Sequence, residues 1–227
     1  MEIPHEEGAR RGAFFDLEKT LTPHAVEQVA ALALWRKGEL TTAQILRVAW
    51  IYLRYDLGLI GDFDTMKRSG APTFAGRDPQ HDAAIYRAFF ESDLRAAIYP
   101  EARAALAACR ASGVEVWIVS ATYAFMVEPY AEVLGVDGWF GVRLEEAEGR
   151  CTGRITGTIW GQEGKAQAVR EVAERKGLDL ARCWAFGDSL NDLAMLEAVG
   201  RPVCVNPAKG LRRIAEEKGW TILKWGS

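Results

Sequence analysis

The chain contains four short apolar runs, each ending in a polar residue: Gly12 to Asp16, Val114 to Ser120, Cys183 to Asp188 and Pro202 to Asn206. Continuous apolar runs of this length are typical of strands that are buried on both faces of a parallel sheet. Their polar ends fall where the chain would leave the sheet. We therefore predict parallel strands with polar side chains at their carboxyl ends.

Helical segments lie between these runs. Three of them have a glycine directly after the last helical residue: Pro100 to Ser112, Lys165 to Lys176 and Asn191 to Val199. A glycine in that position is a common helix end signal. Strands that alternate with helices predict the α/β class, here a Rossmann-like, three-layer α/β/α core whose parallel sheet is covered on both faces. Ligands of such sheets bind at the carboxyl ends of the strands.

Residues 23–98 interrupt the alternation, because they carry helix signals and no convincing strand. Capping residues are spaced along this segment: Thr22 directly before a proline, Thr41 three residues before a glutamine, and Asp78 directly before a proline. Each of these patterns favours the start of a helix. We predict an inserted cap domain of three or four helices.

The chain then divides into a catalytic core of residues 1–22 and 99–227 and a helical cap domain of residues 23–98. Within the core, residues 142–159 contain three glycines among β-forming residues. This composition predicts a small β excursion before the helix near Lys165.

The charge balance excludes two classes of partner. With 28 basic and 31 acidic residues and a formal net charge of -3, the chain lacks the basic excess that binding to a nucleic-acid backbone favours. Its most apolar long stretch, Ile45 to Ile60, contains charged residues and is too short to span a bilayer. We expect neither a nucleic-acid partner nor a membrane.

The cysteines and the N-terminus bear on the compartment. Four cysteines lie far apart and form no CxxC pair, which is typical of reduced thiols in a core rather than of a zinc site or disulfide framework. The first twelve residues show no signal-peptide pattern and are interpreted as a short tail. These features predict a cytoplasmic protein.

Four chemically competent side chains are predicted to meet at one edge of the sheet. Asp16, Ser120 and Asp188 end three of the apolar runs, and Lys165 opens a helix. Each alone has a structural explanation as a helix cap, a turn former or a surface lysine. The carboxyl ends of parallel strands meet at one edge of the sheet, where ligands bind. Chance is a less probable explanation for all four groups at that edge, two carboxylates, a hydroxyl and an ammonium, than for any one of them alone.

Four motifs carry a resemblance to a known family: FFDLEKTLT at 14–22, IVSATY at 118–123, GKAQAV at 164–169 and FGDSLNDLAML at 186–196. On these motifs the chain resembles the haloacid dehalogenase (HAD) superfamily of phosphatases, specifically subfamily IB, the phosphoserine phosphatase-like branch. The resemblance covers nearly the whole chain. The first and fourth motifs are the specific ones.

The resemblance implies a phosphatase that acts on a small phosphomonoester. Asp16 would attack the phosphorus and form an aspartyl phosphate, which water then hydrolyses. Carboxylates and a phosphate in one pocket repel one another, so a hard cation such as Mg²⁺ is implied. Its ligands by family correspondence are the Asp16 carboxylate, the Glu18 backbone carbonyl and Asp188.

The remaining motif positions are implied to hold the phosphate or to support the site. Ser120 would donate a hydrogen bond to a phosphoryl oxygen, with Ala121 beside it, and Lys165 would neutralise charge on the phosphate and the nucleophile. Asp192 lies four residues after Asp188 and would orient Lys165 or a metal-bound water. Further supporting residues by this correspondence are Asn191 and Ser189.

Glu18 departs from the family pattern, where an aspartate acts as general acid and then as general base. A glutamate keeps the carboxyl group but lengthens the side chain by about 1.5 Å. Glutamate also stands here in a related phosphoserine:homoserine phosphotransferase. We predict that Glu18 is a competent general acid/base, and a phosphotransferase remains the alternative function. A non-catalytic binding module is a third hypothesis, motivated by Glu18 alone.

The cap is expected to select the substrate. Similar phosphoserine phosphatases hold the substrate's amino group with an acidic residue nine positions after the nucleophile, where this chain has Ala25. Glu27 is close in sequence but is predicted to point elsewhere on its helix. The cap is rich in aromatic residues, most of which we interpret as its core. The sequence therefore argues against phosphoserine as the substrate.

Overall fold

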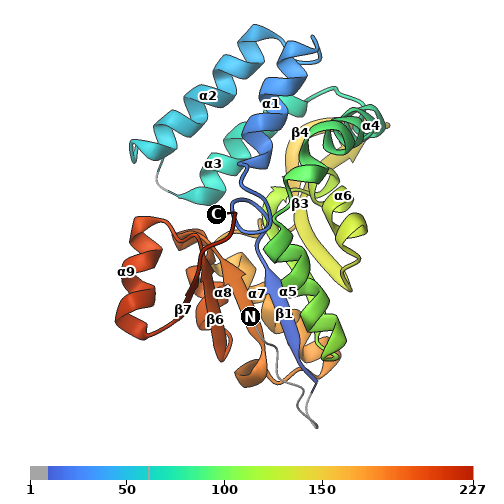
Figure 1. Ribbon diagram of the computed structural model, residues 1–227. Helices are drawn as coiled ribbons and strands as arrows, with labels where there is room; N and C mark the ends of the chain where they lie inside the picture. Colours follow the sequence, from blue (N-terminus) through green and yellow to red (C-terminus); the bar gives the residue numbers. More distant parts are fainter. Residues whose placement is uncertain (1–9, 61, 227) are drawn as a thin grey trace.

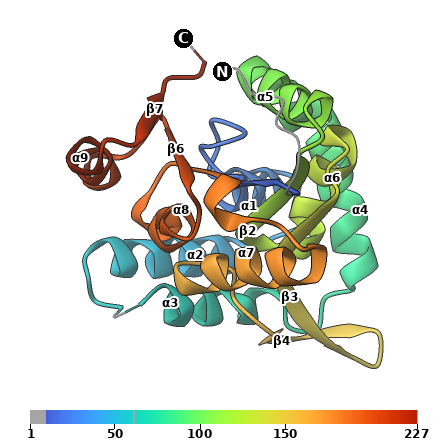
Figure 2. The same ribbon diagram turned by 90° about the horizontal axis from the view of Figure 1, so that it is seen from below.

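The computed structural model describes residues 10–60 and 62–226, so most of the predicted N-terminal tail lies outside the described residues. Its central sheet has the strand order β4-β3-β2-β1-β5-β6-β7 (Figures 1 and 2). The strands are β1 (Gly12–Phe15), β2 (Glu115–Tyr123), β3 (Gly138–Ala147), β4 (Arg150–Thr156), β5 (Trp184–Gly187), β6 (Arg201–Val205) and β7 (Thr221–Leu223). Neighbouring strands are parallel except for the antiparallel β3–β4 pair.

Helices cover both faces of the sheet, as Figure 2 shows. One face packs against α5 (Pro100–Ala111) and α6 (Ala124–Leu134). The other face packs against α7 (Glu163–Lys176), α8 (Leu193–Glu197) and α9 (Lys209–Lys218). Alternate residues of a strand serve opposite faces, so Phe15 lies in the first core cluster and Phe14 in the second. The predicted parallel α/β class is confirmed.

The segment between β1 and α5 is helical. It contains α1 (Val26–Arg36), α2 (Thr42–Asp56), α3 (Phe63–Gly70), η1 (Ala71–Phe74), α4 (Pro79–Phe89), η2 (Phe90–Leu94) and η3 (Arg95–Ala97). The described part of this segment, residues 26–60 and 62–97, contains no strand. Figure 1 shows α1, α2 and α3 above the end of the sheet where β1 stops. The helical insertion therefore covers the carboxyl ends of the central strands.

Two of the three predicted helix starts in this segment are confirmed. Thr41 caps α2 through a full capping box with Gln44, and Asp78 caps α4 by accepting the backbone N–H of Gln80 at 2.9 Å. The start at Thr22 is wrong, because α1 begins only at Val26. Thr22 is buried instead in a tight loop whose Leu21 carbonyl accepts the backbone N–H of Tyr99 at 3.0 Å.

We expect Thr41→Ala to lower the free energy of unfolding by about 1 kcal/mol. The Thr41 hydroxyl accepts the Gln44 backbone N–H at 3.2 Å, and the Gln44 side chain accepts the Thr41 backbone N–H at 2.8 Å. Urea titration followed by circular dichroism measures the loss. Thr42→Ala is the matched control, since the Thr42 hydroxyl makes an exposed contact with Trp35 at 3.3 Å. An equal loss in both variants would contradict the capping role.

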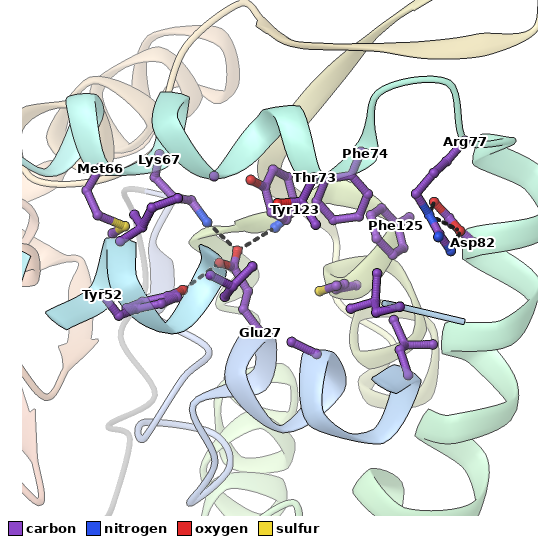
Figure 3. Close-up of a pocket in the computed structure, with 17 residues that line it drawn as sticks. Glu27, Tyr52, Met66, Lys67, Thr73, Phe74, Arg77, Asp82, Tyr123 and Phe125 are labelled. Atoms are coloured by element: carbon purple, nitrogen blue, oxygen red, sulfur yellow. Dashed lines mark hydrogen bonds and ion pairs between the residues drawn. The ribbon is translucent and has the colours of Figure 1, made fainter. Parts of the chain in front are cut away.

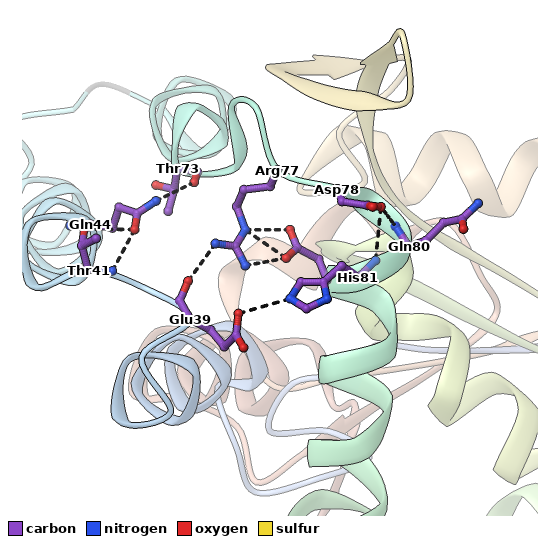
Figure 4. Close-up of polar contacts among 9 residues, drawn as sticks. Glu39, Thr41, Gln44, Thr73, Arg77, Asp78, Gln80 and His81 are labelled. Atoms are coloured by element: carbon purple, nitrogen blue, oxygen red, sulfur yellow. Dashed lines mark hydrogen bonds and ion pairs between the residues drawn. The ribbon is translucent and has the colours of Figure 1, made fainter.

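Polar contacts join the helices of the insertion to one another and to the sheet. Arg77 donates to both carboxylate oxygens of Asp82. It also donates to the Glu39 carbonyl at 2.8 Å, as Figure 4 shows. Backbone hydrogen bonds link Gly76 to the Cys151 carbonyl at 2.8 Å and Cys151 to the Arg77 carbonyl at 2.9 Å. The β3–β4 hairpin, which starts four residues before the predicted β excursion, thus holds the helical segment against the core.

The cysteines and the helix lengths agree with the composition. All four cysteines are buried and none forms a disulfide. Across the described residues, no helix combines the length and the apolar character that crossing a bilayer requires.

Candidate active site

Two aspartates lie directly after neighbouring strands of the sheet. Asp16 follows β1, and its backbone N–H donates to the Phe186 carbonyl of β5 at 2.9 Å. Asp188 follows β5. Both are buried, and within the described residues their carboxylate oxygens lie within 4.8 Å of each other and of an Asp192 oxygen. The parallel arrangement of β1 and β5 brings these carboxylates together.

Lys165, in the first turn of α7, points at this cluster. Its Nζ donates to Asp16 Oδ1 and to Asp192 Oδ1, each at 2.5 Å. The preceding Gly164 allows the approach, because a Cβ there would lie 2.2 Å from the Ile159 carbonyl oxygen. The lysine is buried with the two carboxylates that it joins.

Asp192 lies behind the cavity and not in its wall. Its second oxygen, Oδ2, accepts the backbone N–H groups of Asp188 and Ser189 at 3.0 Å each and the Ser189 hydroxyl at 3.2 Å. Close packing is possible because residue 187 is glycine, where a Cβ would lie 2.4 Å from the Asp192 Cβ. Asp192 therefore uses its oxygens to fix Lys165 and the loop that carries Asp188.

The cluster carries more buried negative charge than its lysine offsets. Burial raises the pKa of Asp16 to about 6, against the opposing effect of Lys165. Burial, followed by the charges of Asp16 and Asp192, raises the pKa of Asp188 to about 8. Burial alone would lower the pKa of Lys165, but the two carboxylates that it contacts raise it overall. A bound cation would offset this negative charge, and the three buried aspartates offer it carboxylate oxygens.

Ser120 lies inside a longer strand than the sequence predicts. β2 continues to Tyr123, and its pairing with β3 changes register between Val119 and Tyr123. The irregular stretch includes Ser120, whose hydroxyl oxygen accepts the Thr122 backbone N–H at 3.1 Å. Such bulges re-aim side chains near sites. Ser120 and Ala121 both line the cavity beside Asp16.

These residues surround a cavity of about 220 Å³. The core supplies one side of its lining: Asp16, Glu18, Lys19, Ser120, Ala121, Lys165, Asp188, Ser189 and Asn191. The helical segment supplies the other: Ala25, Glu27, Gln28, Tyr52, Tyr55, Phe63, Met66 and Lys67. The structure thus brings the site residues expected from the sequence to one place, with Asp192 in support. Their catalytic roles remain predictions.

Glu18 stands between the aspartate cluster and the helical segment. Its Oε1 accepts the backbone N–H of Glu27 at 3.1 Å. Burial raises its pKa to about 7, with Glu27 adding to the increase and Lys67 opposing it. A carboxyl group with that pKa can both donate and accept a proton near neutral pH.

The predicted orientation of Glu27 is wrong, because its side chain points into the cavity. Figure 3 shows Glu27 contacting Lys67 and Tyr52, and the Tyr52 hydroxyl donates to it at 2.9 Å. The Tyr123 backbone N–H donates to the same carboxylate at 3.3 Å. The late start of α1 places Glu27 in its first turn and changes the direction of the side chain.

Sequence reasoning also missed Lys67 and Tyr52 as partners of Glu27. Lys67 is buried although it is a lysine on a short amphipathic helix, and its Nζ lies 4.4 Å from the centre of the Tyr123 ring. A second, apolar cavity of about 60 Å³ lies beyond this group (Figure 3).

Comparison with known proteins identifies the family. Residues 13–197 match the family model described as haloacid dehalogenase-like hydrolase. The chain belongs to this family. A solved structure of a protein with unknown function from Bordetella pertussis Tohama I superposes on this haloacid dehalogenase-like hydrolase with a TM-score of 0.85 and 32% identity, covering 95% of this chain and 99% of that chain.

Named relatives indicate to which branch of the family this hydrolase belongs. A probable phosphatase of Mycobacterium tuberculosis is 33% identical over 221 residues, 96% of this chain and 76% of the relative. Phosphoserine phosphatase SerB1 of the same organism is 32% identical over 215 residues, which are 92% of this chain and 69% of that relative. Histidinol-phosphatase of Neisseria meningitidis is 28% identical over 218 residues, which are 94% of this chain and 98% of that relative. The hydrolase is a phosphatase of the phosphoserine phosphatase-like branch.

Proposed function

We propose that the protein is a Mg²⁺-dependent phosphatase that hydrolyses a small phosphomonoester through an aspartyl phosphate on Asp16. One observation carries the proposal: Lys165 is fixed between Asp16 and Asp192, in the wall of a cavity that Asp188 and Glu18 share. A non-catalytic binding module would not require a buried lysine and three buried carboxylates in contact, because such clusters are costly to bury.

Asp16 is the proposed nucleophile. Lys165 holds its Oδ1, so the other carboxylate oxygen is available to attack the phosphorus. The new P–O bond to Asp16 forms as the ester P–O bond breaks, and the leaving alkoxide takes the proton of Glu18. Water then gives a proton to Glu18 and attacks the same phosphorus. This second step releases inorganic phosphate and restores the Asp16 carboxylate.

Ser120 and Lys165 are the proposed phosphate-binding side chains, with Ala121 beside them. The Ser120 oxygen accepts the Thr122 N–H, so its own hydroxyl proton can be donated to a phosphoryl oxygen. The Lys165 ammonium neutralises charge that develops on the phosphoryl group. Ser189 and Asn191 complete the wall on the side of Asp188.

The site fits Mg²⁺ by its donor chemistry. Asp16 and Asp188 offer buried carboxylate oxygens with raised pKa values, which indicates negative charge without a sufficient counter-charge. These two residues and the Glu18 backbone carbonyl would hold the ion, which prefers oxygen ligands. When bound, it would neutralise the repulsion between the carboxylates and the phosphate.

Residues 23–98 are proposed to act as a cap domain over the core of residues 1–22 and 99–227. The helical segment contributes eight of the seventeen residues that line the cavity, including the Glu27 carboxylate and the rings of Tyr55 and Phe63. It therefore contacts whatever part of the substrate lies beyond the phosphate, and it decides the leaving group.

We further propose a phosphate ester of a 2-amino alcohol as the substrate. Phosphoserine and histidinol phosphate, named for two relatives, share that structure. They differ in carrying a carboxylate or an imidazole ring. In this cavity the Lys67 cation is already paired with Glu27, while Tyr55, Phe63 and Met66 offer apolar surface. The lining favours the ring over the carboxylate.

We expect metal-dependent phosphate release, at least about tenfold faster for histidinol phosphate than for phosphoserine, because the apolar side chains of Tyr55, Phe63 and Met66 suit the imidazole ring better than a carboxylate. The measurement is inorganic phosphate released from a panel of phosphomonoesters, including an aryl phosphate, with and without Mg²⁺. Faster turnover of phosphoserine would contradict the assignment of the leaving group. Metal-independent turnover would contradict the role of Mg²⁺.

A phosphotransferase is the second candidate, and Glu18 is the observation that favours it. The same residues would form the aspartyl phosphate, but an acceptor alcohol would replace water. An added amino alcohol that captures phosphate in preference to water would establish transfer. Unchanged phosphate release in its presence would establish hydrolysis.

A further inference from the structure

Helix α2 has two apolar faces, only one of which packs on the protein. Val48, Ile51 and Tyr52 line the cavities inside the helical segment. On the opposite side Leu46, Trp50, Leu53 and Leu57 are between 47% and 64% exposed. Their spacing of four, three and four residues places them in one line along the helix. A helix at the surface of a monomer ordinarily presents polar residues there.

The exposed line continues onto α1. The Trp35 ring nitrogen donates to the Thr42 hydroxyl at the start of α2, at 3.3 Å, and Leu32 lies one turn before Trp35. Both side chains are more than a third exposed. We call these six residues the outer stripe: Leu32, Trp35, Leu46, Trp50, Leu53 and Leu57. Figure 1 shows α2 at the outer edge of the molecule, away from the core.

The outer stripe has no role in the site described above. None of its residues lines the cavity that contains Asp16. At about 200 Å² for each fully exposed large side chain, its exposed fractions correspond to about 600 Å² of apolar surface. An apolar patch of about that area is at the upper end of what a monomer exposes, and such patches are often functional.

We propose that the outer stripe is the interface with a second copy of this chain, formed by α2 packing against α2 of the partner. Apolar residues at alternating spacings of three and four are what two helices need to interdigitate. A twofold axis presents the same patch from both copies, so the interface is complementary to itself. Two patches would bury about 1,200 Å², the lower end of the range for stable interfaces.

Charge favours a second copy over a membrane surface. Helices that lie on membranes carry a strongly charged face opposite the apolar one. The opposite face of α2 is packed into the helical segment instead, where Val48 and Ile51 line a cavity. With a formal net charge of -3, the whole chain is not attracted to anionic lipid.

The test is the mass of the full chain in solution, by sedimentation velocity over a range of micromolar concentrations. We expect twice the chain mass for the wild type. For Trp50→Glu combined with Leu53→Glu we expect the dissociation constant of the dimer to be at least about 100-fold larger, because both residues lie at the centre of the outer stripe. Arg213→Glu on α9 is the matched control, since it makes the same change in charge at a site that is 77% exposed. Circular dichroism confirms that each variant is folded.

Other outcomes would overturn the proposal. A wild type that is monomeric at every concentration would do so, as would a dimer that survives in the double variant or is lost in the control. Binding of the monomer to phosphatidylserine vesicles, abolished in the double variant, would assign the stripe to a membrane instead. A separate variant, Leu53→Cys, should form a disulfide-linked dimer under mild oxidation. If the wild type is a dimer but Leu53→Cys forms no disulfide-linked dimer, the interface lies elsewhere.

Discussion

Replacing Asp16 by asparagine is expected to reduce phosphate release by at least about 10⁴-fold, as loss of a covalent nucleophile does in other enzymes. The amide cannot form the acyl phosphate on which both proposed steps depend. The fold should survive, because Asp16→Asn removes one negative charge from a buried cluster of three carboxylates around Lys165. Single-turnover phosphate release measures the loss of activity, and a thermal melt measures the stability of the fold.

A matched control separates chemistry from stability. Asp179→Asn makes the same substitution at a residue that caps a short helical turn, where its Oδ1 accepts the Ala181 backbone N–H at 3.1 Å. We expect activity within about twofold of the wild type there, because the residue contacts no part of the cavity. If Asp16→Asn retains more than a small fraction of wild-type turnover, Asp16 is not the nucleophile.

The parts of the fold that the sequence predicted depend on local patterns. Buried parallel strands have to be apolar along their length, so β1, β5 and β6 were recognisable, and so was the meeting of Asp16 and Asp188 at their ends. β7 was missed because its three residues, partly exposed at the edge of the sheet, carry too short a pattern. The position of Ser120 inside β2 was missed because a bulge leaves no signature in the apolar run.

The parts of the site that the sequence did not predict depend on packing between distant segments. Glu27, Tyr52 and Lys67 come from three helices and meet only because these helices pack against one another within the insertion. No spacing rule relates residues 25 and 40 positions apart. The orientation of Glu27 in particular depends on a helix start that differs from the predicted one. Local motifs predicted the residues at the strand ends, and tertiary packing determines the opposite wall.

Glu18→Gln is expected to lower the hydrolysis of alkyl phosphates by about 10²- to 10⁴-fold, because an amide can neither protonate the leaving group nor accept a proton from water. An aryl phosphate should behave differently, since its leaving group needs no proton. The first step then proceeds and the second stalls. The expected result is a burst of one equivalent of aryl alcohol per active site, measured by stopped-flow absorbance.

Glu18→Asp is the companion variant, because it keeps the carboxyl group and shortens the side chain by about 1.5 Å. We expect it to turn over without a burst, at a rate between those of the wild type and Glu18→Gln, because misplacement of this size can cost about 100-fold. Equal steady-state rates for the wild type and Glu18→Gln would remove Glu18 from the mechanism. The wild type, which keeps this base for either acceptor, separates the two proposed functions: if an added amino alcohol carries the phosphoryl group away in preference to water, the natural acceptor is an alcohol. The length of Glu18 would then favour transfer over hydrolysis.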